Sequence, residues 1–260
     1  RSKALVPVHF AGRPADLARI EAIAAARELL LVEDAAHAIE ARVGDRRMGQ
    51  SPGMSCFSFY VTKNMTTAEG GMVCVNDEAL AERIKVLALH GLSADAWSRF
   101  SDQGYRHYEV VYPGFKYNLT DIAASLGLVQ LPRLDAWLKR REAIWAAYDQ
   151  AFTSLPVQCP AAPEPGTRHA RHLYTLMLRD DAPLSRDAFM VAMHKAGVGT
   201  GVHYRSLHLH PYYRDRFGFS PDAFPNAAWV SERTVSLPLS AKLGDHEVER
   251  VIETVTQLLT

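Results

Sequence analysis

The sequence predicts an α/β fold with a mainly parallel sheet in a large first domain, followed by a small α+β domain. A strand, a helix and a second strand follow one another within residues 4–34, an order typical of a βαβ unit. The second strand, 29–34, begins as a continuous apolar run, as expected in a parallel sheet that is covered on both faces. The Pro-rich stretch 160–166 marks a change of composition near a domain boundary. We expect a large domain over 1–131, a connecting helix over 132–152 and a small domain over 153–260.

Composition and charge exclude several classes of function. The chain of 260 residues carries 29 basic and 29 acidic side chains, so charge gives it no general attraction to nucleic acid or to anionic membranes. Hydrophobic residues make up 48% of the chain, which is enough to bury a sizeable core. No apolar stretch reaches about 18 residues, so we expect no membrane span. Cys56, Cys74 and Cys159 form no CxxC pair, which favours reduced thiols in a cytoplasmic protein.

The first 34 residues contain the elements of the predicted βαβ unit. Residues 1–10 lack the pattern of a signal peptide, because their apolar run is short and no small-residue cleavage site follows. The chain enters the strand 4–10 almost at once, so we expect it to begin in the middle of a fold. Gly-Arg-Pro at 12–14 ends this strand, and Asp16 is the expected N-cap of an amphipathic helix over 16–28.

Two further strands are predicted over 53–60 and 70–76. Either Asn76 or Asp77 can cap the helix that follows, because both side chains accept hydrogen bonds from a first helical turn. Residues 91–117 are rich in Gly, Ser, Asp and aromatic residues. We interpret them as a long excursion without its own core, of the kind that is usually functional or mobile.

A helix with Thr120 as its N-cap is predicted over 118–131. Pro132 should kink or restart it, and apolar residues at helical spacing continue to residue 152. The small domain is expected to contain a strand over 172–179, a helix over 185–197 between an N-cap Ser185 and a stop at Gly197, a strand over 198–204 and a helix over 245–259.

Lys63 lies in the stretch SFYVTKNMTTAEGGMV (58–73), where hydroxyl and amide side chains surround it. A lysine after a strand is most often a solvated surface residue, and this interpretation stays open. A lysine that is withdrawn from water has a lowered pKa and attacks carbonyl groups as a neutral amine. The best-known use is a Schiff base with pyridoxal phosphate. Such a site needs a carboxylate at the ring nitrogen and hydrogen-bond donors at the phosphate.

Other residues near strand ends fit this second interpretation. Asp34 ends the strand 29–34, at the edge where open α/β sheets bind ligands, although an acid there also commonly caps a helix. Ser58 lies five residues before Lys63 and can donate to a phosphate. Gly70 and Gly71 would allow the backbone to pass closely. The combination is more specific than any one of these residues, and from the residues alone both interpretations of Lys63 remain.

Four stretches closely resemble, in order and spacing, the nucleotide-sugar aminotransferases of the DegT type. They are VEDAAHA (32–38), FSFYVTKNMTTAEGGMV (57–73), YPGFKYNLTDIAASLGLVQL (112–131) and GVGTGVHYRSLHLHPYYR (197–214). The resemblance covers essentially the whole chain. It implies pyridoxal phosphate as the cofactor and the fold-type-I aminotransferase fold, with a mainly parallel seven-stranded large domain and a smaller C-terminal domain. Residues 1–131 would then be the C-terminal portion of the cofactor-binding domain.

The resemblance also implies roles for individual residues. Lys63 would form the Schiff base and move the proton between the substrate carbon and the cofactor, and Asp34 would pair with the ring nitrogen. His37 would lie near the cofactor ring, and Ser58 would hold the phosphate. Asn118 would reach the phosphate of the cofactor bound by the partner subunit, so the active unit would be a homodimer.

The sequence departs from the family's pattern in two ways. Tyr60 stands where members often have histidine, and we expect this to change little. Members also carry a long additional segment before the strand that corresponds to 4–10, which supplies part of the phosphate cradle and an aromatic ring stacked on the cofactor. We therefore expect this chain to be the C-terminal portion of a longer protein, or a truncated form.

Three histidines and a tyrosine lie close together in HYRSLHLH (203–210). The spacing supplies no complete set of metal ligands, so we expect no metal. A hydrogen-bonding loop suits a sugar diphosphate, and we expect His203 and Tyr204 to contact the substrate. For His208 and His210, substrate contact and a place on a polar surface loop both stay open.

The segment with His90, Trp97 and Arg99 is either a flap over a nucleotide or a loop whose tryptophan packs on the protein.

The resemblance implies transfer of an amino group, with glutamate as donor, to carbon four of a sugar linked to uridine diphosphate. The partners would be the nucleotide sugar and the amino acid. One alternative is a sugar dehydratase of the same fold, in which histidine replaces the lysine, so Lys63 argues against it. The other alternative is a regulatory member without catalysis.

Overall fold

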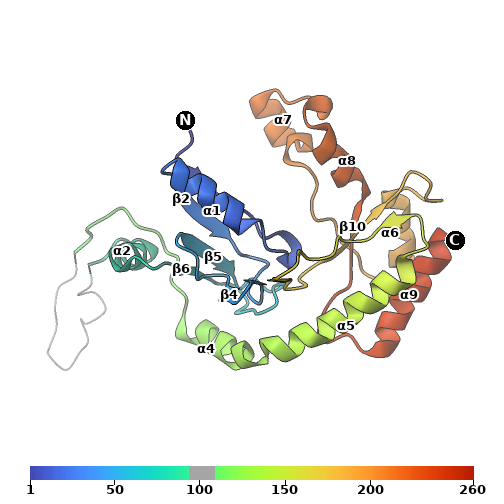
Figure 1. Cartoon of the computed structure of the whole chain (residues 1–260), viewed down its shortest axis with the longest axis horizontal. Helices are drawn as coiled ribbons and strands as arrows, with labels where there is room; N and C mark the ends of the chain where they lie inside the picture. Colours follow the sequence, from blue (N-terminus) through green and yellow to red (C-terminus); the bar gives the residue numbers. More distant parts are fainter. Residues whose placement is uncertain (94–108) are drawn as a thin grey trace. The chain divides into compact units, whose positions relative to one another are not determined.

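The structure is a computed structural model that describes residues 1–93 and 109–260, and the chain divides into two compact units (Figure 1). The first unit contains Arg1–Leu134 and Gly166–His169, and the second contains Asp135–Pro165 and Ala170–Thr260. The domain limits expected from the sequence stay predictions. Trp97 and Arg99 lie outside the described residues.

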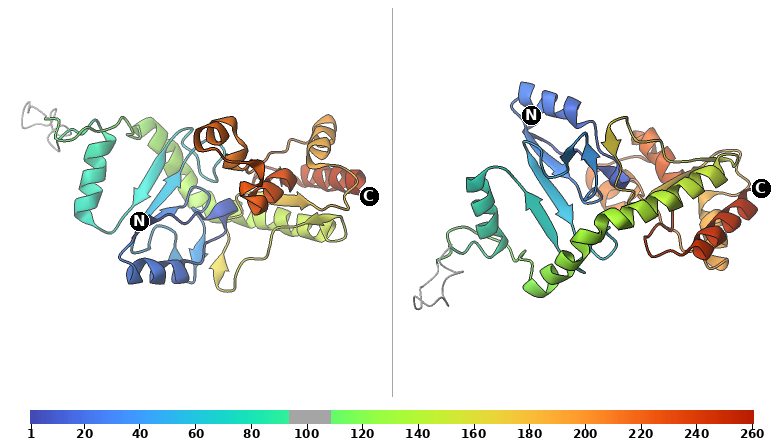
Figure 2. Two further views of the ribbon diagram at one scale, coloured as in Figure 1. Left: turned by 90° about the horizontal axis from the view of Figure 1, so that it is seen from above. Right: turned by 60° about the horizontal axis from the view of Figure 1, so that its bottom comes forward.

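A four-stranded sheet in the order β1-β2-β5-β6 organises the first unit (Figure 1, Figure 2). Its strands are β1 (Ala4–Leu5), β2 (Leu30–Asp34), β5 (Met54–Ser58) and β6 (Gly71–Cys74). The first three run parallel, and β6 is antiparallel to β5. Helix α1 (Leu17–Ala26) connects β1 to β2, which confirms the predicted βαβ unit. The strand expected over 4–10 is shorter, because beyond Leu5 only Val8 makes a bridge, to Asp34, before the 3-10 turn η1 (Phe10–Gly12).

A second, small sheet of the first unit has the order β4-β3-β8 and is antiparallel. Its strands are β3 (Arg42–Val43), β4 (Arg46–Arg47) and β8 (Thr167–Arg168). The sequence did not predict these strands, because two residues are too few to show a periodic pattern.

The helices of the first unit begin at the predicted capping residues. The Asp16 carboxylate accepts a hydrogen bond from the Arg19 amide before α1. Asp77 accepts from the Leu80 amide before α2 (Glu78–Ala88), so Asp77 and not Asn76 is the cap. Each of these bonds satisfies an amide that has no partner within the first helical turn.

Thr120 caps α4 (Asp121–Gln130) through a bond from the Ala123 amide. Pro132 lies in the 3-10 turn η2 (Leu131–Arg133), and α5 (Leu134–Phe152) follows directly. The proline therefore restarts the helix, as predicted. No helix within residues 1–93 and 109–260 is both long and apolar enough to cross a membrane.

The second unit is built around a three-stranded antiparallel sheet in the order β10-β9-β7. Its strands are β7 (Val157–Gln158), β9 (Tyr174–Leu178) and β10 (Thr234–Leu237), and its larger helices are α5, α6 (Arg186–Lys195) and α9 (Asp245–Leu259). One core of buried apolar side chains joins these elements, including Tyr148, Phe152, Tyr174, Phe189 and Val255. The predicted helices and the caps at Ser185 and Gly197 are confirmed.

The strand predicted over 198–204 is wrong. Only Gly201 makes a strand-like contact there, a bridge to Ser236 of β10, and glycines at 199 and 201 weaken a strand because they supply no side chain to pack. The sheet is completed by β10, which the sequence did not predict. The other elements between 205 and 233 are η3 (Leu207–Leu209), α7 (Pro211–Phe217), η4 (Pro221–Ala223) and α8 (Pro225–Arg233).

Candidate active site at the carboxyl ends of β2 and β5

Asp34 and Ser58 end two neighbouring parallel strands of the first unit. Asp34 is paired with Cys56 across β2 and β5, and Ser58 lies two residues further along β5. Parallel strands place their carboxyl ends at the same edge of a sheet, which is where open α/β sheets bind ligands. Two of the predicted site residues therefore share one sheet edge.

Lys63 follows β5 in a tight turn, in which its amide donates to the Tyr60 carbonyl at 2.9 Å. Its side chain is half-buried, and burial lowers the pKa of the amine, while the negative charge of Asp34 raises it by less. A larger fraction of neutral, nucleophilic amine exists at a given pH when the pKa is lower. A lowered pKa is the property that a nucleophilic lysine needs, and the role of Lys63 stays a prediction.

The charge of Asp34 reaches both Lys63 and the thiol of Cys56. Burial raises the pKa of Cys56, and the charge of Asp34 raises it further. The Asp34 backbone is held on both sides, because its amide donates to Pro7 and its carbonyl accepts from the His9 amide. Its carboxylate accepts from the Ala36 amide at 3.0 Å. Asp34 is thus held in place by three hydrogen bonds, and its charge acts on Lys63; its role at a cofactor ring stays a prediction.

His37 is buried in the turn after β2. Its Nδ1 accepts a hydrogen bond from the Ala11 amide at 3.2 Å, and its ring lies 6.0 Å from the ring of Phe10, centroid to centroid. A nitrogen that accepts from an N–H carries no proton, so the neutral ring has its proton on Nε2.

Ser58 faces Gly71 across the β5–β6 ladder, and its Oγ accepts a long bond from the Tyr60 amide at 3.4 Å. A Cβ added at Gly71 would come within 2.8 Å of the Phe57 carbonyl oxygen, and one added at Gly70 would collide with the Thr67 hydroxyl. The expected close backbone approach is therefore confirmed at Gly71, whereas at Gly70 the atoms that approach belong to side chains.

Asn118 lies just before α4, where the Lys116 amine donates to its side-chain oxygen. It lines a cavity of about 680 Å³ together with Cys56, Gly70, Gly71 and other residues of β5, β6 and α2. Within the first unit, the structure therefore brings Asn118 close to the glycine pair that follows Lys63. Its predicted contact with a partner subunit stays a prediction.

Two contacts that the sequence did not predict hold the Lys63 turn. The Asn64 amide donates to the buried carboxylate of Glu40 at 2.8 Å. Gln130, at the end of α4, accepts from the Thr66 amide at 3.1 Å and donates to the Thr66 carbonyl at 2.6 Å. The sequence showed only that polar side chains surround Lys63. It did not show which residues these side chains contact, because the contacted residues lie 24 and 64 positions away along the chain.

The predicted substrate residues His203 and Tyr204 belong to the second unit. Nδ1 of His203 lies 2.7 Å from the Ser236 hydroxyl, and its ring meets Tyr204 edge to face, with the centroids 4.9 Å apart. The Tyr204 side chain is exposed, so it can contact a ligand. Their role in substrate binding stays a prediction.

His208 is not on a polar surface loop. It is buried, its Nε2 bonds to the Pro221 carbonyl at 3.1 Å, and its ring packs on Phe224, so it joins η3 to η4. His210 is the residue before α7, and His90 is exposed with a backbone φ of 56°. No group of three His, Cys, Asp or Glu side chains that could hold a metal occurs in the described ranges.

The chain was compared with known proteins. The sequence profile of the DegT/DnrJ/EryC1/StrS aminotransferase family matches residues 1–256. The spore coat polysaccharide biosynthesis protein SpsC of Bacillus subtilis is 43% identical over 261 residues, an alignment that covers 100% of this chain and 67% of SpsC.

Two solved structures share the fold. The aminotransferase TlmJ from Streptoalloteichus hindustanus has a TM-score of 0.85 and 33% identity, over 98% of this chain and 65% of that one. Spr1654 from Streptococcus pneumoniae, assigned as a sugar aminotransferase, has a TM-score of 0.89 in its PMP form and 32% identity, over 98% of this chain and 69% of that one. Spr1654 is also known in a PLP form.

The chain spans about two thirds of the length of these relatives. The comparisons confirm the predicted fold class and pyridoxal phosphate as the cofactor of these enzymes. The residues at the β2–β5 edge fit that cofactor, because they combine a half-buried amine of lowered pKa with a carboxylate and a hydroxyl. With a profile match over nearly its whole length, the chain belongs to the DegT/DnrJ/EryC1/StrS aminotransferase family.

Proposed function

We propose that this chain carries the cofactor lysine, Lys63, of an enzyme that transfers an amino group from an amino acid to the keto carbon of a sugar. One observation carries the proposal. The Lys63 amine is half-buried beside the sheet edge, its pKa is lowered by burial, and the charge of Asp34 acts on it. A family aminotransferase needs this pair, an amine that forms a bond to the cofactor and a carboxylate at the ring nitrogen.

Each residue at the sheet edge has a definite task in this proposal. Pyridoxal phosphate, when bound, supplies an electron sink for the carbon that gains or loses the amino group. Asp34 would hold the proton on the ring nitrogen, and His37 would lie near the ring. The Ser58 hydroxyl would donate to the phosphate, and the Lys63 amine would carry the proton to and from the substrate carbon.

A sugar substrate is supported by the relatives. SpsC is named for polysaccharide biosynthesis, and Spr1654 is assigned as a sugar aminotransferase. We further propose that the sugar is linked to uridine diphosphate, that carbon four receives the amino group and that glutamate donates it in the cytoplasm. The likeness of GTGVHYR and KYNLTD to enzymes of this specificity supports the substrate, with His203 and Tyr204 in contact with it.

We also propose that the enzyme is a homodimer in which Asn118 serves the partner's cofactor. Large apolar side chains are exposed on both sides of Asn118 in the sequence, among them Tyr117, Ile122 and Leu128. Monomeric proteins rarely leave such apolar surface uncovered. A second copy of the chain would cover it and would bring Asn118 to the other subunit's site.

The test of the function is product formation by the purified full-length protein. A 4-keto sugar linked to uridine diphosphate and glutamate should give the amino sugar and an equal amount of 2-oxoglutarate. Lys63→Ala should abolish both products. Lys139→Ala, which removes an exposed lysine of α5, is the matched control and should leave the rate unchanged. Absence of both products from the wild-type protein with 4-keto and 3-keto sugars alike would contradict the proposal.

A further inference from the structure

One short segment, Pro7–Ala11, contacts both residues that are proposed to act on the cofactor ring. The Pro7 carbonyl accepts from the Asp34 amide at 2.9 Å, and the His9 amide donates to the Asp34 carbonyl at 3.0 Å. The Ala11 amide donates to Nδ1 of His37 at 3.2 Å. The backbone of Asp34 and the ring of His37 are therefore both held by the same five residues.

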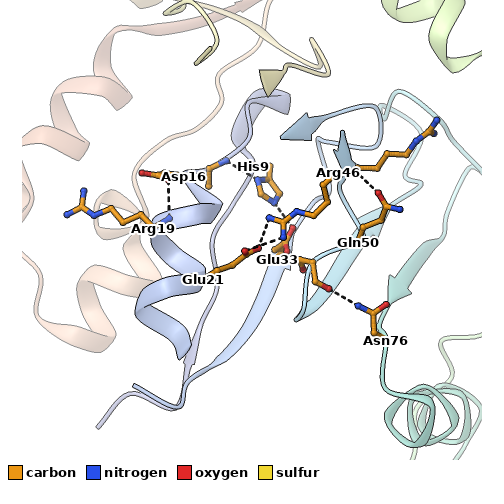
Figure 3. A network of polar contacts seen from close by, with 11 residues as sticks. His9, Asp16, Arg19, Glu21, Glu33, Arg46, Gln50 and Asn76 are labelled. Carbon is orange, nitrogen blue, oxygen red and sulfur yellow. Dashed lines mark hydrogen bonds and ion pairs between the residues drawn. The ribbon is translucent and has the colours of Figure 1, made fainter. Parts of the chain in front are cut away.

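The side chain of His9 anchors this segment in the interior. His9 is fully buried, its Nε2 lies 3.0 Å from the Glu33 carboxylate, and its Nδ1 accepts from the Ala15 amide at 3.0 Å (Figure 3). A nitrogen that accepts from an amide carries no proton, so the Nε2 of the ring is the nitrogen that donates to Glu33. Both ring nitrogens are thus used to hold His9 in place.

Glu33 receives this bond as a carboxylate. Burial raises the pKa of the Glu33 carboxyl, whereas the hydrogen bond from His9 and the positive charge of Arg46 lower it, and the pKa is lowered overall. The Arg46 guanidinium is itself held by Glu21, at 2.7 and 3.2 Å (Figure 3). A hydrogen bond to an ionised acceptor is about twice as strong as one between neutral groups, which suits an anchor.

Glu33 and Asp34 are consecutive in β2, so their side chains point to opposite faces of the sheet. The bond between His9 and Glu33 therefore lies on the face of the sheet opposite to the Asp34 side chain, and it acts on the site through the backbone of Pro7–Ala11 and of β2. We propose that His9 and Glu33 are positioning residues, which hold Pro7–Ala11 against β2 and thereby fix Asp34 and His37 for the cofactor ring. The roles of Asp34 and His37 rest on the proposed function, whereas the contacts do not.

The tautomer of His37 reports directly on this positioning. In cofactor-free protein labelled with ¹⁵N-histidine, at a pH about 1.5 units above the usual histidine pKa of about 6.5, His37 should show one unprotonated Nδ1 and one protonated Nε2. The signals are assigned by their loss in His37→Gln. Both Glu33→Leu and His9→Leu remove the anchoring bond, and in both the single His37 tautomer should be lost to a mixture.

Glu33→Gln is the conservative variant, because its side-chain oxygen still accepts from His9. It should keep the wild-type His37 signals. Glu33→Leu leaves the buried Nε2–H of His9 without its acceptor, which lowers stability, so the melting temperature of this variant is measured alongside its His37 signals. Leu134→Ala removes a buried side chain of the same unit outside this segment, and it should lower the melting temperature without changing the His37 tautomer.

Two results would overturn the inference. One is a folded Glu33→Leu or His9→Leu protein with the wild-type His37 signals. The other is a Glu33→Gln protein with an unchanged melting temperature in which His37 shows a mixture of tautomers. This second result does not depend on the folding of either leucine variant. Because this measurement is made without cofactor, its failure is distinct from a failure of the proposed function, which appears as absent amino-sugar product.

Discussion

Replacing Gln130 by alanine should loosen the turn that carries Lys63. The Gln130 side chain makes two hydrogen bonds to the backbone of Thr66, one to its amide and one to its carbonyl. Each such bond contributes about 0.5–1.5 kcal/mol net. Thr66 is half-buried, so water replaces the lost partner only in part. Loss of both bonds should therefore cost about 1–3 kcal/mol of local stability.

Hydrogen exchange at the Thr66 amide measures this cost where it arises. A loss of 1–3 kcal/mol corresponds to about a 5- to 150-fold faster exchange through local opening, because about 1.4 kcal/mol is a factor of ten. Gln150→Ala in α5 is the matched control, since it makes the same change at an exposed helical position and should stay within about 0.5 kcal/mol of wild type. If the Thr66 amide exchanges at the same rate in both variants, Gln130 does not hold the turn.

Three further outcomes follow from the same geometry. Asp34→Asn removes the charge that raises the pKa of Lys63, so that pKa should fall further. The pH at which Lys63 reacts half-maximally with an amine-acylating reagent should then decrease. An increase would contradict the assignment of Asp34 as the nearby charge. The same variant should keep its fold and bind cofactor, but it should lose orders of magnitude in transamination rate, because an unprotonated ring is a poor electron sink. Near-normal activity would show that another group holds the ring nitrogen. Mixing inactive Lys63→Ala protein with an inactive Asn118→Ala protein should restore some activity, since hybrid dimers contain one site with both residues intact; no recovery under conditions that exchange subunits would argue against a shared site.

Features that depend on neighbouring residues in the chain could be predicted from the sequence. Asp16, Thr120 and Ser185 cap their helices as expected, because a cap bonds to an amide three residues away. Asp34 and Ser58 lie at the same sheet edge, because each lies at or near the end of a predicted strand and parallel strands align their ends.

Features that depend on distant residues could not be predicted. The bonds from Gln130 to Thr66 and from His9 to Glu33 join positions 64 and 24 residues apart, and no periodic pattern relates such pairs. His208 was placed at the surface or in the site because a histidine in a polar stretch gives no sign of burial. The two glycines at 199 and 201 made the predicted strand after α6 too weak to form more than one bridge.

Chemical trapping of the cofactor shows which lysine forms the Schiff base. The full-length protein is incubated with pyridoxal phosphate, treated with borohydride and digested, and the modified peptide is identified by mass spectrometry. We expect a reduced phosphopyridoxyl group on Lys63, loss of the visible absorbance band in Lys63→Ala, and no change in Lys139→Ala. A stoichiometric adduct on a different lysine, or an adduct retained by Lys63→Ala, would contradict this expectation.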